Sequence, residues 1–218
     1  MAMKLYAHPF SSYCQKVLIA LYENATPFEF CQLGPGTEAA AELAALWPLG
    51  KMPLLLDEGV AVKEASIIIE HLGLHHPGPV ALVPADPQLG LEVRFLDRFF
   101  DNYVMTPMQK LVFDCIRAPA ERDPAGVADA HRLLGTAYAW LEGHLQGRVW
   151  AAGEQFSLAD AAAAPALFYA DWVHPIGADL QNLLAYRQRL LARPSFARAV
   201  DEARPYRGFF PPGAPDRD

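Results

Sequence analysis

The chain has 218 residues, of which 52% are apolar and 20% are charged, so it is long enough for one globular domain or two small ones. Its 25 acidic and 18 basic residues give a net charge of −7 without a basic cluster, which argues against nucleic acid or an anionic membrane as a partner. No apolar run approaches the ~20 residues that span a bilayer, and the N-terminus carries no apolar segment typical of a secretory signal.

The first part of the chain alternates between strand and helix patterns. KLYAH and PFEFCQL (residues 27–33) predict strands, and Val17, Leu18 and Leu21 between them have helical spacing. TEAAAELAALW (residues 37–47) predicts a short helix, MPLLLDEGVAVKEA predicts two strands joined by a tight turn, and EASIIIEHLGL predicts a last helix. This β-α-β-α-β-β-α order is the thioredoxin-like topology.

The rest of the chain lacks strand patterns. Four prolines lie in HHPGPVALVPADP, which predicts a linker, and apolar residues at helical spacing follow it to the C-terminal region. Ser157 and Asp160 have capping-box spacing, with Phe156 placed as a hydrophobic staple. We therefore expect an α/β thioredoxin-like domain over residues 1–76, a linker over 77–87, and an all-α domain over 88–218.

The turn HPFSSYCQKVLIALYEN joins the first strand to the first helix. Ser12 and Gln15 have the spacing of a capping box, which leaves the hydroxyl of Ser11 free near the positive end of the helix dipole. That is a favourable place for an anion such as a thiolate, although both serines could instead compete to cap the helix. Cys14 lies in the first turn of this helix, where we expect it to point into the domain; a reactive thiol there is the alternative.

The odd count of three cysteines and the absence of a CxxC motif favour free thiols in a reducing cytoplasm. We expect Cys31 and Cys115 to be buried as small apolar residues. The seven histidines show no metal-binding spacing, so no metal is predicted, and His75 and His76 are interpreted as a solvated helix end. In LWPLGKMPLLLD, Met52 precedes Pro53 at the start of a strand, where a cis bond is plausible and a trans proline on an edge strand is the alternative.

Taken together, HPFSSYCQKVLIAL, LWPLGKMPLLLD, EASIIIEHL and FSLADAAAAP resemble, in order and spacing, the cytosolic glutathione transferase superfamily. The resemblance covers nearly the whole chain, and DRFFDNYVMTPMQKLV is similar to a segment of bacterial members. It implies a thioredoxin-like domain that binds glutathione as co-substrate, an apolar pocket from the helices, a homodimer, and a role in detoxification.

The resemblance also implies site residues. Ser11 matches the serine that hydrogen-bonds the glutathione sulfur in serine-type classes, with Ser12, Tyr13 and Cys14 as alternative catalytic residues. Tyr13 falls where certain bacterial classes have a cysteine. The residues that match the glutathione-binding segments are Lys51, Met52, Pro53, Glu64, Ala65 and Ser66.

One of these positions departs from the family pattern. Family members usually have Glu-Ser where this chain has Glu64 and Ala65, with Ser66 one position late. One helical residue is a rotation of about 100°, so Ser66 cannot replace the usual serine, but the backbone N–H of Ala65 remains for a carboxylate. Glutathione should then bind, but more weakly.

The expected function is conjugation of the glutathione thiolate to a small hydrophobic electrophile. Candidates to line the electrophile pocket are Phe10, Tyr13, Tyr103, Met108 and Phe113. Two alternatives stay open at this point. One is a glutathione-dependent thiol, disulfide or peroxide reductase that works through bound glutathione or Cys14; the other is a non-catalytic protein that binds glutathione, a hydrophobic ligand or another protein.

Overall fold

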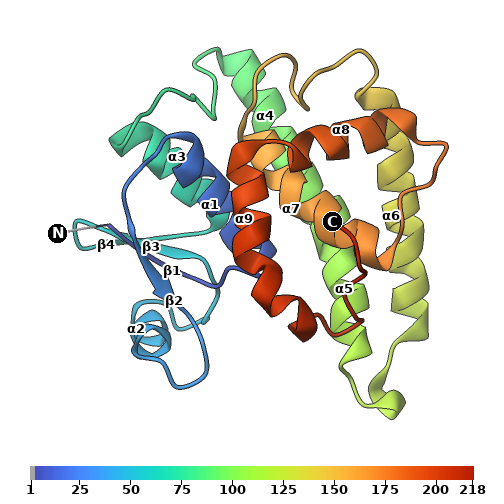
Figure 1. Ribbon diagram of the computed structural model, residues 1–218, viewed down its shortest axis with the longest axis horizontal. Helices are drawn as coiled ribbons and strands as arrows, with labels where there is room; N and C mark the ends of the chain where they lie inside the picture. The colour runs from blue at the N-terminus through green and yellow to red at the C-terminus, as the bar shows by residue number, and fades with distance from the viewer. Residues whose placement is uncertain (1–2) are drawn as a thin grey trace.

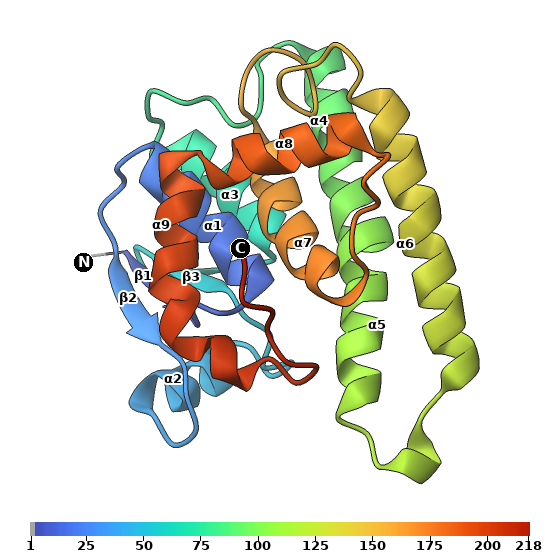
Figure 2. The ribbon, with the colours of Figure 1, turned by 45° about the vertical axis from the view of Figure 1, so that its right-hand side comes forward.

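The computed structural model describes residues 3–218, with a small sheet domain beside a larger set of helices (Figures 1 and 2). The sheet has the strand order β2-β1-β3-β4, built from β1 (Lys4–Ala7), β2 (Glu29–Gln32), β3 (Leu54–Asp57) and β4 (Val60–Lys63). β1 pairs parallel to β2 and antiparallel to β3, and β3 pairs antiparallel to β4. This mixed sheet confirms the thioredoxin-like prediction.

Three helices belong to this sheet domain: α1 (Ser12–Glu23), α2 (Glu38–Leu46) and α3 (Ala65–His75). The tight turn between β3 and β4 forms as predicted, because Glu58 and Gly59 both have positive φ, 49° and 84°. Such angles at both central residues match the right-handed twist of the flanking strands.

The second half of the chain is helical, as expected. A long helix is made of α4 (Pro87–Phe99), a π-helical stretch η1 (Phe100–Met105) and α5 (Thr106–Cys115). It is followed by η2 (Pro119–Glu121), α6 (Pro124–His144), α7 (Leu158–Val173), α8 (Gln181–Leu191), α9 (Pro194–Ala203) and η3 (Arg204–Phe209). Within residues 3–218 no helix is long and apolar enough to cross a membrane.

Helix α7 forms the centre of the helical domain and packs against α1 of the sheet domain (Figure 2). Its predicted capping box is present: the Asp160 carboxylate accepts the Ser157 backbone N–H at 2.9 Å, and Phe156 is buried beside it. Burial raises the pKa of Asp160, although four hydrogen bonds, one from Tyr186, partly offset that effect. The helix continues through Pro165.

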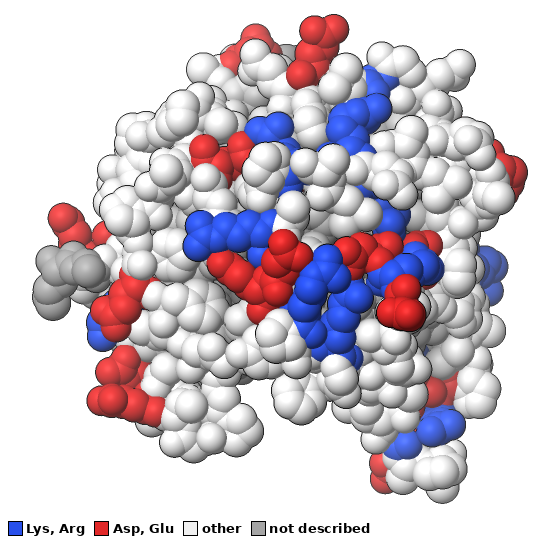
Figure 3. Space-filling model, in the orientation of Figure 1, with Lys and Arg blue, Asp and Glu red and all other residues white. Residues whose placement is uncertain are grey.

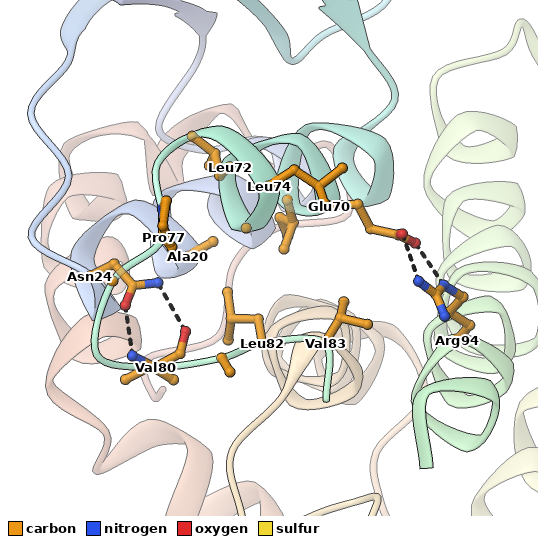
Figure 4. A pocket seen from close by; sticks show the side chains of 14 residues that line it. Ala20, Asn24, Glu70, Leu72, Leu74, Pro77, Val80, Leu82, Val83 and Arg94 are labelled. Atoms are coloured by element: carbon orange, nitrogen blue, oxygen red, sulfur yellow. Dashed lines mark hydrogen bonds and ion pairs between the residues drawn. The ribbon is translucent and has the colours of Figure 1, made fainter. Parts of the chain in front are cut away.

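The segment between α3 and α4 lies against the sheet domain and covers a cavity of about 230 Å³ (Figure 4). Asn24, the C-cap of α1, holds this segment through two hydrogen bonds to the backbone of Val80, at 2.8 and 3.1 Å. At the other end of the cavity the guanidinium of Arg94 pairs in a bidentate manner with Glu70 at 2.8 and 2.9 Å. The linker is therefore fixed at both of its sides.

On the face drawn in Figure 3, acidic and basic side chains lie next to one another around the position where Figure 1 marks the C-terminus. Ion pairs of Arg204 with Asp201 and Asp218 belong to this set. Charges of one sign do not gather on this face.

The expectation that Cys31 and Cys115 are buried was wrong. Cys31 is half-buried on β2, which lies at the edge of the sheet, and Cys115 is exposed at the C-terminal end of α5. A small apolar residue is buried only where a neighbouring element covers it, and here an edge strand and a helix end leave both positions uncovered.

Candidate active site

A cleft of about 580 Å³ opens where the sheet domain meets the long helix of the helical domain. It brings together eight of the residues singled out in the sequence: Ser11, Tyr13, Lys51, Met52, Pro53, Glu64, Ala65 and Phe113. They come from the start of α1, the approach to β3, the start of α3 and the far end of α5. It also includes residues that the sequence did not single out as site residues: Trp47, Gly50, Arg98, Asp101, Asn102 and Gln109.

Ser11 is the N-cap residue of α1 and has extended backbone angles. Its side chain caps no backbone N–H of the helix, so capping does not occupy the hydroxyl, as predicted; it lies on the cleft and hydrogen-bonds with the Cys14 thiol. The unpaired N–H groups of the first helical turn give this end of α1 a partial positive charge, which stabilises a thiolate.

The capping box predicted for Ser12 and Gln15 does not form. Ser12 is the first residue of the helix rather than its cap, and it is buried outside the cleft. The Gln15 amide instead donates to the carbonyl of Pro9 at 3.0 Å and to the hydroxyl of Tyr169 at 3.1 Å. A partner from α7, distant in sequence, thus outcompetes the local cap.

Cys14 points into the domain, as expected, and its side chain has no exposed surface. Burial raises the pKa of its thiol to about 11, although hydrogen bonds with Ser11 and with the backbone of His8 lower it by a smaller amount. The thiol is therefore protonated at neutral pH and has no access to solvent, which disfavours Cys14 as a nucleophile.

The approach to β3 exposes backbone groups to the cleft. The bond between Met52 and Pro53 is cis, as the sequence suggested, and Met52 lies half-exposed on the cleft wall. Lys51 is exposed beside it. Glu64 follows Lys63, which pairs with Leu54, and it has φ 70° and ψ 123°. This conformation is unfavourable for a residue with a Cβ, costs about 1–3 kcal/mol and is typical of ligand sites.

The first residues of α3 have different environments. Ala65 lines the cleft, and the free N–H groups of the first turn point out of this helix end. Ser66 is buried away from the cleft, where its hydroxyl accepts from the Lys16 ammonium at 3.0 Å and donates to Asp97 at 2.8 Å. Ser66 therefore cannot replace a serine at position 65, in agreement with the rotation expected from the sequence.

A buried ionic cluster lies behind the start of α3. The Lys16 ammonium is 2.5 Å from Asp97 and 3.0 Å from Asp101, and the Lys16 side chain is only 1% exposed. Burial raises the pKa of Asp101, with Lys16 lowering it and Asp97 raising it further. Arg98 closes the cluster from the cleft side through 2.7 Å pairs with both aspartates.

Arg98 and Asp101 also line the cleft. Arg98 comes from the last turn of α4, and Asp101 and Asn102 come from the π-helical stretch η1 that follows it. A paired cation and anion at this place complement a zwitterionic amino-acid end such as that of a γ-glutamyl group.

Three candidates for the apolar pocket lie elsewhere. Phe10 packs against Tyr169 and Phe210, Met108 is buried in the core at 5% exposure, and Tyr103 contacts Phe99 on the outer surface. Residues from the C-terminal third of the chain cover Phe10, which local patterns could not reveal. Of the predicted pocket residues, Tyr13 and the half-exposed Phe113 face the cleft.

Family models for the glutathione S-transferase N-terminal and C-terminal domains match residues 5–80 and 104–194. A glutathione S-transferase from Methylobacterium radiotolerans, solved with glutathione sulfonate, superposes with a TM-score of 0.81 at 32% identity over 92% of this chain and 95% of that one. The chain belongs to the glutathione S-transferase family. Its fold and its relatives are those of a glutathione transferase enzyme.

Two further relatives have names of different kinds. FtsZ-localized protein A from Caulobacter vibrioides is 30% identical over 203 residues, with 88% of each chain covered. Glutathione S-transferase theta-1 from Bos taurus is 28% identical over 212 residues, with 88% of this chain and 83% of that protein covered. Membership of the family thus extends to proteins named for enzymatic activity and to one named for its location.

Proposed function

We propose that the protein joins the thiolate of glutathione to a small hydrophobic electrophile, with Ser11 as the residue that donates a hydrogen bond to the sulfur. The observation that supports this most directly is that the Ser11 hydroxyl caps no helix N–H and lies at the positive end of α1, on the same cleft as Met52 and Ala65. Met52 would pair its backbone with the cysteinyl residue of glutathione.

In this proposal the γ-glutamyl end of glutathione binds at the start of α3, near Glu64, Ala65 and the Arg98–Asp101 pair. Its carboxylate accepts from the backbone N–H of Ala65, where the helix dipole favours an anion. Lys51 lines the same cleft and matches the family's glutathione-binding segment. Tyr13, Phe113 and Trp47 are the apolar surfaces left for the electrophile.

The serine contributes modestly to the rate. A thiol of pKa ~8.5 is about 3% ionised at pH 7, and a decrease of ~2 units makes about three quarters of it thiolate. Because nucleophilicity falls with pKa, at a Brønsted slope of ~0.4–0.5, the net gain is only a few-fold. Holding the electrophile against the sulfur must supply most of the acceleration.

The test is the pH profile of conjugation to an aryl halide by Ser11→Ala, with Ser12→Ala as the matched control. We expect Ser11→Ala to lower kcat/KM at pH 7 by about threefold and to raise the kinetic pKa by ~2 units, so that activity recovers at high pH. Ser12→Ala should keep the wild-type profile. An unchanged profile for Ser11→Ala would reject the proposed role of this hydroxyl.

The variant Cys14→Ala tests the reductase alternative when conjugation and disulfide reduction are both measured on it. Since the Cys14 thiol is buried and its pKa is raised to about 11, we expect conjugation to be retained. Loss of glutathione-dependent disulfide reduction in that variant, with conjugation intact, would favour the reductase instead. For a purely non-catalytic binding protein, wild type should bind glutathione in isothermal titration yet give no product.

We further propose a homodimer formed through the aromatic patch, which we define as Leu91, Phe95, Tyr103 and Trp140. These side chains are 41–61% exposed on α4, η1 and α6, and the Phe95 and Trp140 rings lie 6.0 Å apart. Exposed apolar clusters of this kind mark protein contacts. Light scattering should find a dimer for wild type and for Phe209→Glu, and a monomer for Phe95→Glu.

The boundaries proposed for the two domains are residues 1–76 and 88–218, joined by the linker over 77–87. The end of α3 at His75 and the start of α4 at Pro87 support them. Conjugation makes an apolar electrophile more soluble in water, and we propose detoxification in the cytoplasm as the setting for it.

A further inference from the structure

Two histidines and an aspartate meet at the C-terminal end of α3, away from the cleft. His71 lies in the last turns of this helix, His76 is its C-cap, and Asp57 is the last residue of β3. The Nε2 atoms of His71 and His76 lie 2.9 and 2.7 Å from one oxygen of Asp57, its Oδ2. These three residues are called the Asp–His–His cluster below.

The end of the helix explains how the two imidazoles converge. On a continuous helix, residues five apart point about 140° away from each other. His76 leaves the helix with φ −132° and ψ 55°, and this turn brings its ring back to the side of His71. His76 is therefore not the solvated helix end that the sequence indicated, whereas His75 is exposed.

We propose that Asp57, His71 and His76 bind a divalent transition-metal ion, for which Zn²⁺ is the best match. Two imidazole nitrogens and one carboxylate oxygen are a ligand set that suits Zn²⁺ and neighbouring transition metals, whereas Mg²⁺ and Ca²⁺ prefer oxygen ligands alone. Ligand atoms on a tetrahedral Zn²⁺ lie about 3.3 Å apart. In the cluster the two imidazole nitrogens are 2.9 and 2.7 Å from the carboxylate oxygen, and all three ligand atoms lie within 4.8 Å of one another.

The surroundings of the cluster favour a cation. The Asp57 side chain is only 8% exposed, and one of its carboxylate oxygens faces both imidazoles. The carbonyl end of α3 adds a partial negative charge. Glu29 and Glu58 line a groove of about 440 Å³ that also includes Asp57 and His76.

This groove gives the metal a fourth position. With three protein ligands, a tetrahedral ion keeps one site for water or an external ligand, as in zinc sites that are not purely structural. The cluster is separated from the glutathione cleft by the 11 residues of α3, a length of about 15 Å from Ala65 to His75. Metal binding should therefore be independent of glutathione.

The test is isothermal titration of the full chain, without an affinity tag and without glutathione, with ZnCl₂ and with MgCl₂. We expect one Zn²⁺ to bind per chain and Mg²⁺ not to bind. Even a change outside the ligands of a zinc site weakens binding by about 10–100-fold, so Asp57→Asn and His71→Asn should weaken it at least that much. Circular dichroism and glutathione binding establish that these variants are folded.

Two matched controls separate the cluster from general binding by histidines. His75→Asn changes an exposed ring whose centroid lies 4.3 Å from that of His71 without joining the cluster, and His131→Asn changes one member of a histidine pair on the helical domain. Both should bind Zn²⁺ as wild type does. Absence of binding to wild type, or wild-type affinity in His71→Asn, would overturn the proposal.

The visible absorption of bound Co²⁺ provides a second readout, which reports the metal's ligands rather than the folding stability of the variant. Wild type loaded with one Co²⁺ should give the visible absorption of a four-coordinate ion, and His76→Asn should lose it. A spectrum with strong charge transfer from sulfur would place the metal on a cysteine and reject the Asp–His–His cluster.

Discussion

The two ends of α3 carry opposite partial charges and favour ligands of opposite charge. At the start, Ala65 presents free backbone N–H groups to the cleft, where an anion is favoured. At the end, His71 and His76 converge on the carboxylate of Asp57, where a cation is favoured. A helix of 11 residues can thus hold a carboxylate at one terminus and a metal ion at the other without mixing the two sites.

The ends also differ in how they are held. The start of α3 is fixed from behind by Ser66, which belongs to the buried ionic cluster around Lys16. The end is fixed by two hydrogen bonds from histidines whose side chains are 18% and 33% exposed. Perturbing the first end should therefore cost more stability than perturbing the second.

The largest effect should come from Lys16→Met. This change leaves Asp97 and Asp101 buried with only Arg98 to compensate them, and removing one partner of a buried ion pair typically costs about 3–5 kcal/mol. The free energy of unfolding in urea measures it. Lys4→Met is the control, since the 3.8 Å pair of Lys4 with Glu29 is exposed and should contribute less than about 1 kcal/mol. Equal effects of the two changes would show that the buried cluster stabilises the start of α3 no more than an exposed pair stabilises the sheet.

A smaller effect is expected for Asp57→Asn at neutral pH in the presence of a chelator. Both hydrogen bonds go to one carboxylate oxygen, where the amide oxygen of Asn can still accept without the charge, so the loss should be about 1.5–3 kcal/mol. Because the pKa of Asp57 is lowered in the folded state, this stability is present above the unfolded pKa of about 3.9 and is lost as pH falls through the folded value. Urea unfolding of wild type and variant should thus converge below pH ~4; a difference that persists there would contradict it.

The smallest effect is expected for Ala65→Ser, at the start of α3. Ala65→Ser adds a hydroxyl on the cleft at the first residue of α3, where Ser66 cannot serve because it is committed to Lys16 and Asp97. One hydrogen bond to the charged γ-glutamyl carboxylate, worth about 1.5 kcal/mol, should tighten glutathione binding roughly tenfold. Ile67→Ser on the exposed face of the same helix is the control and should leave the affinity unchanged. Weaker binding by Ala65→Ser would mean that the γ-glutamyl end binds elsewhere.

Local patterns predicted the parts of the fold that depend on local chemistry. The order of strands and helices, the Glu58 and Gly59 turn, and the Ser157 capping box each follow from spacing or turn residues within a few positions. The cis bond before Pro53 was one of two alternatives that the sequence left open.

The residues that the sequence misplaced are those decided by distant partners. Gln15 bonds Tyr169 rather than the start of its own helix, and Phe10 is covered by Phe210. In the Asp–His–His cluster, Asp57 at the end of a strand meets His71 and His76, which follow it by 14 and 19 positions at the end of a helix. This spacing is not a known sequence motif. The sequence shows Asp101 beside Asn102, but it gives no signal of the π-helical stretch η1 from which both residues line the cleft.

Lys16 has one more consequence, because it lies on α1 while Asp97 and Asp101 lie on α4 and η1. If one domain unfolded alone, the other would keep its buried charge, Lys16 or the pair of Asp97 and Asp101, without the partner of opposite sign. Such partial unfolding is therefore unfavourable. A calorimeter should therefore record a single endotherm, with the van't Hoff and calorimetric enthalpies in agreement.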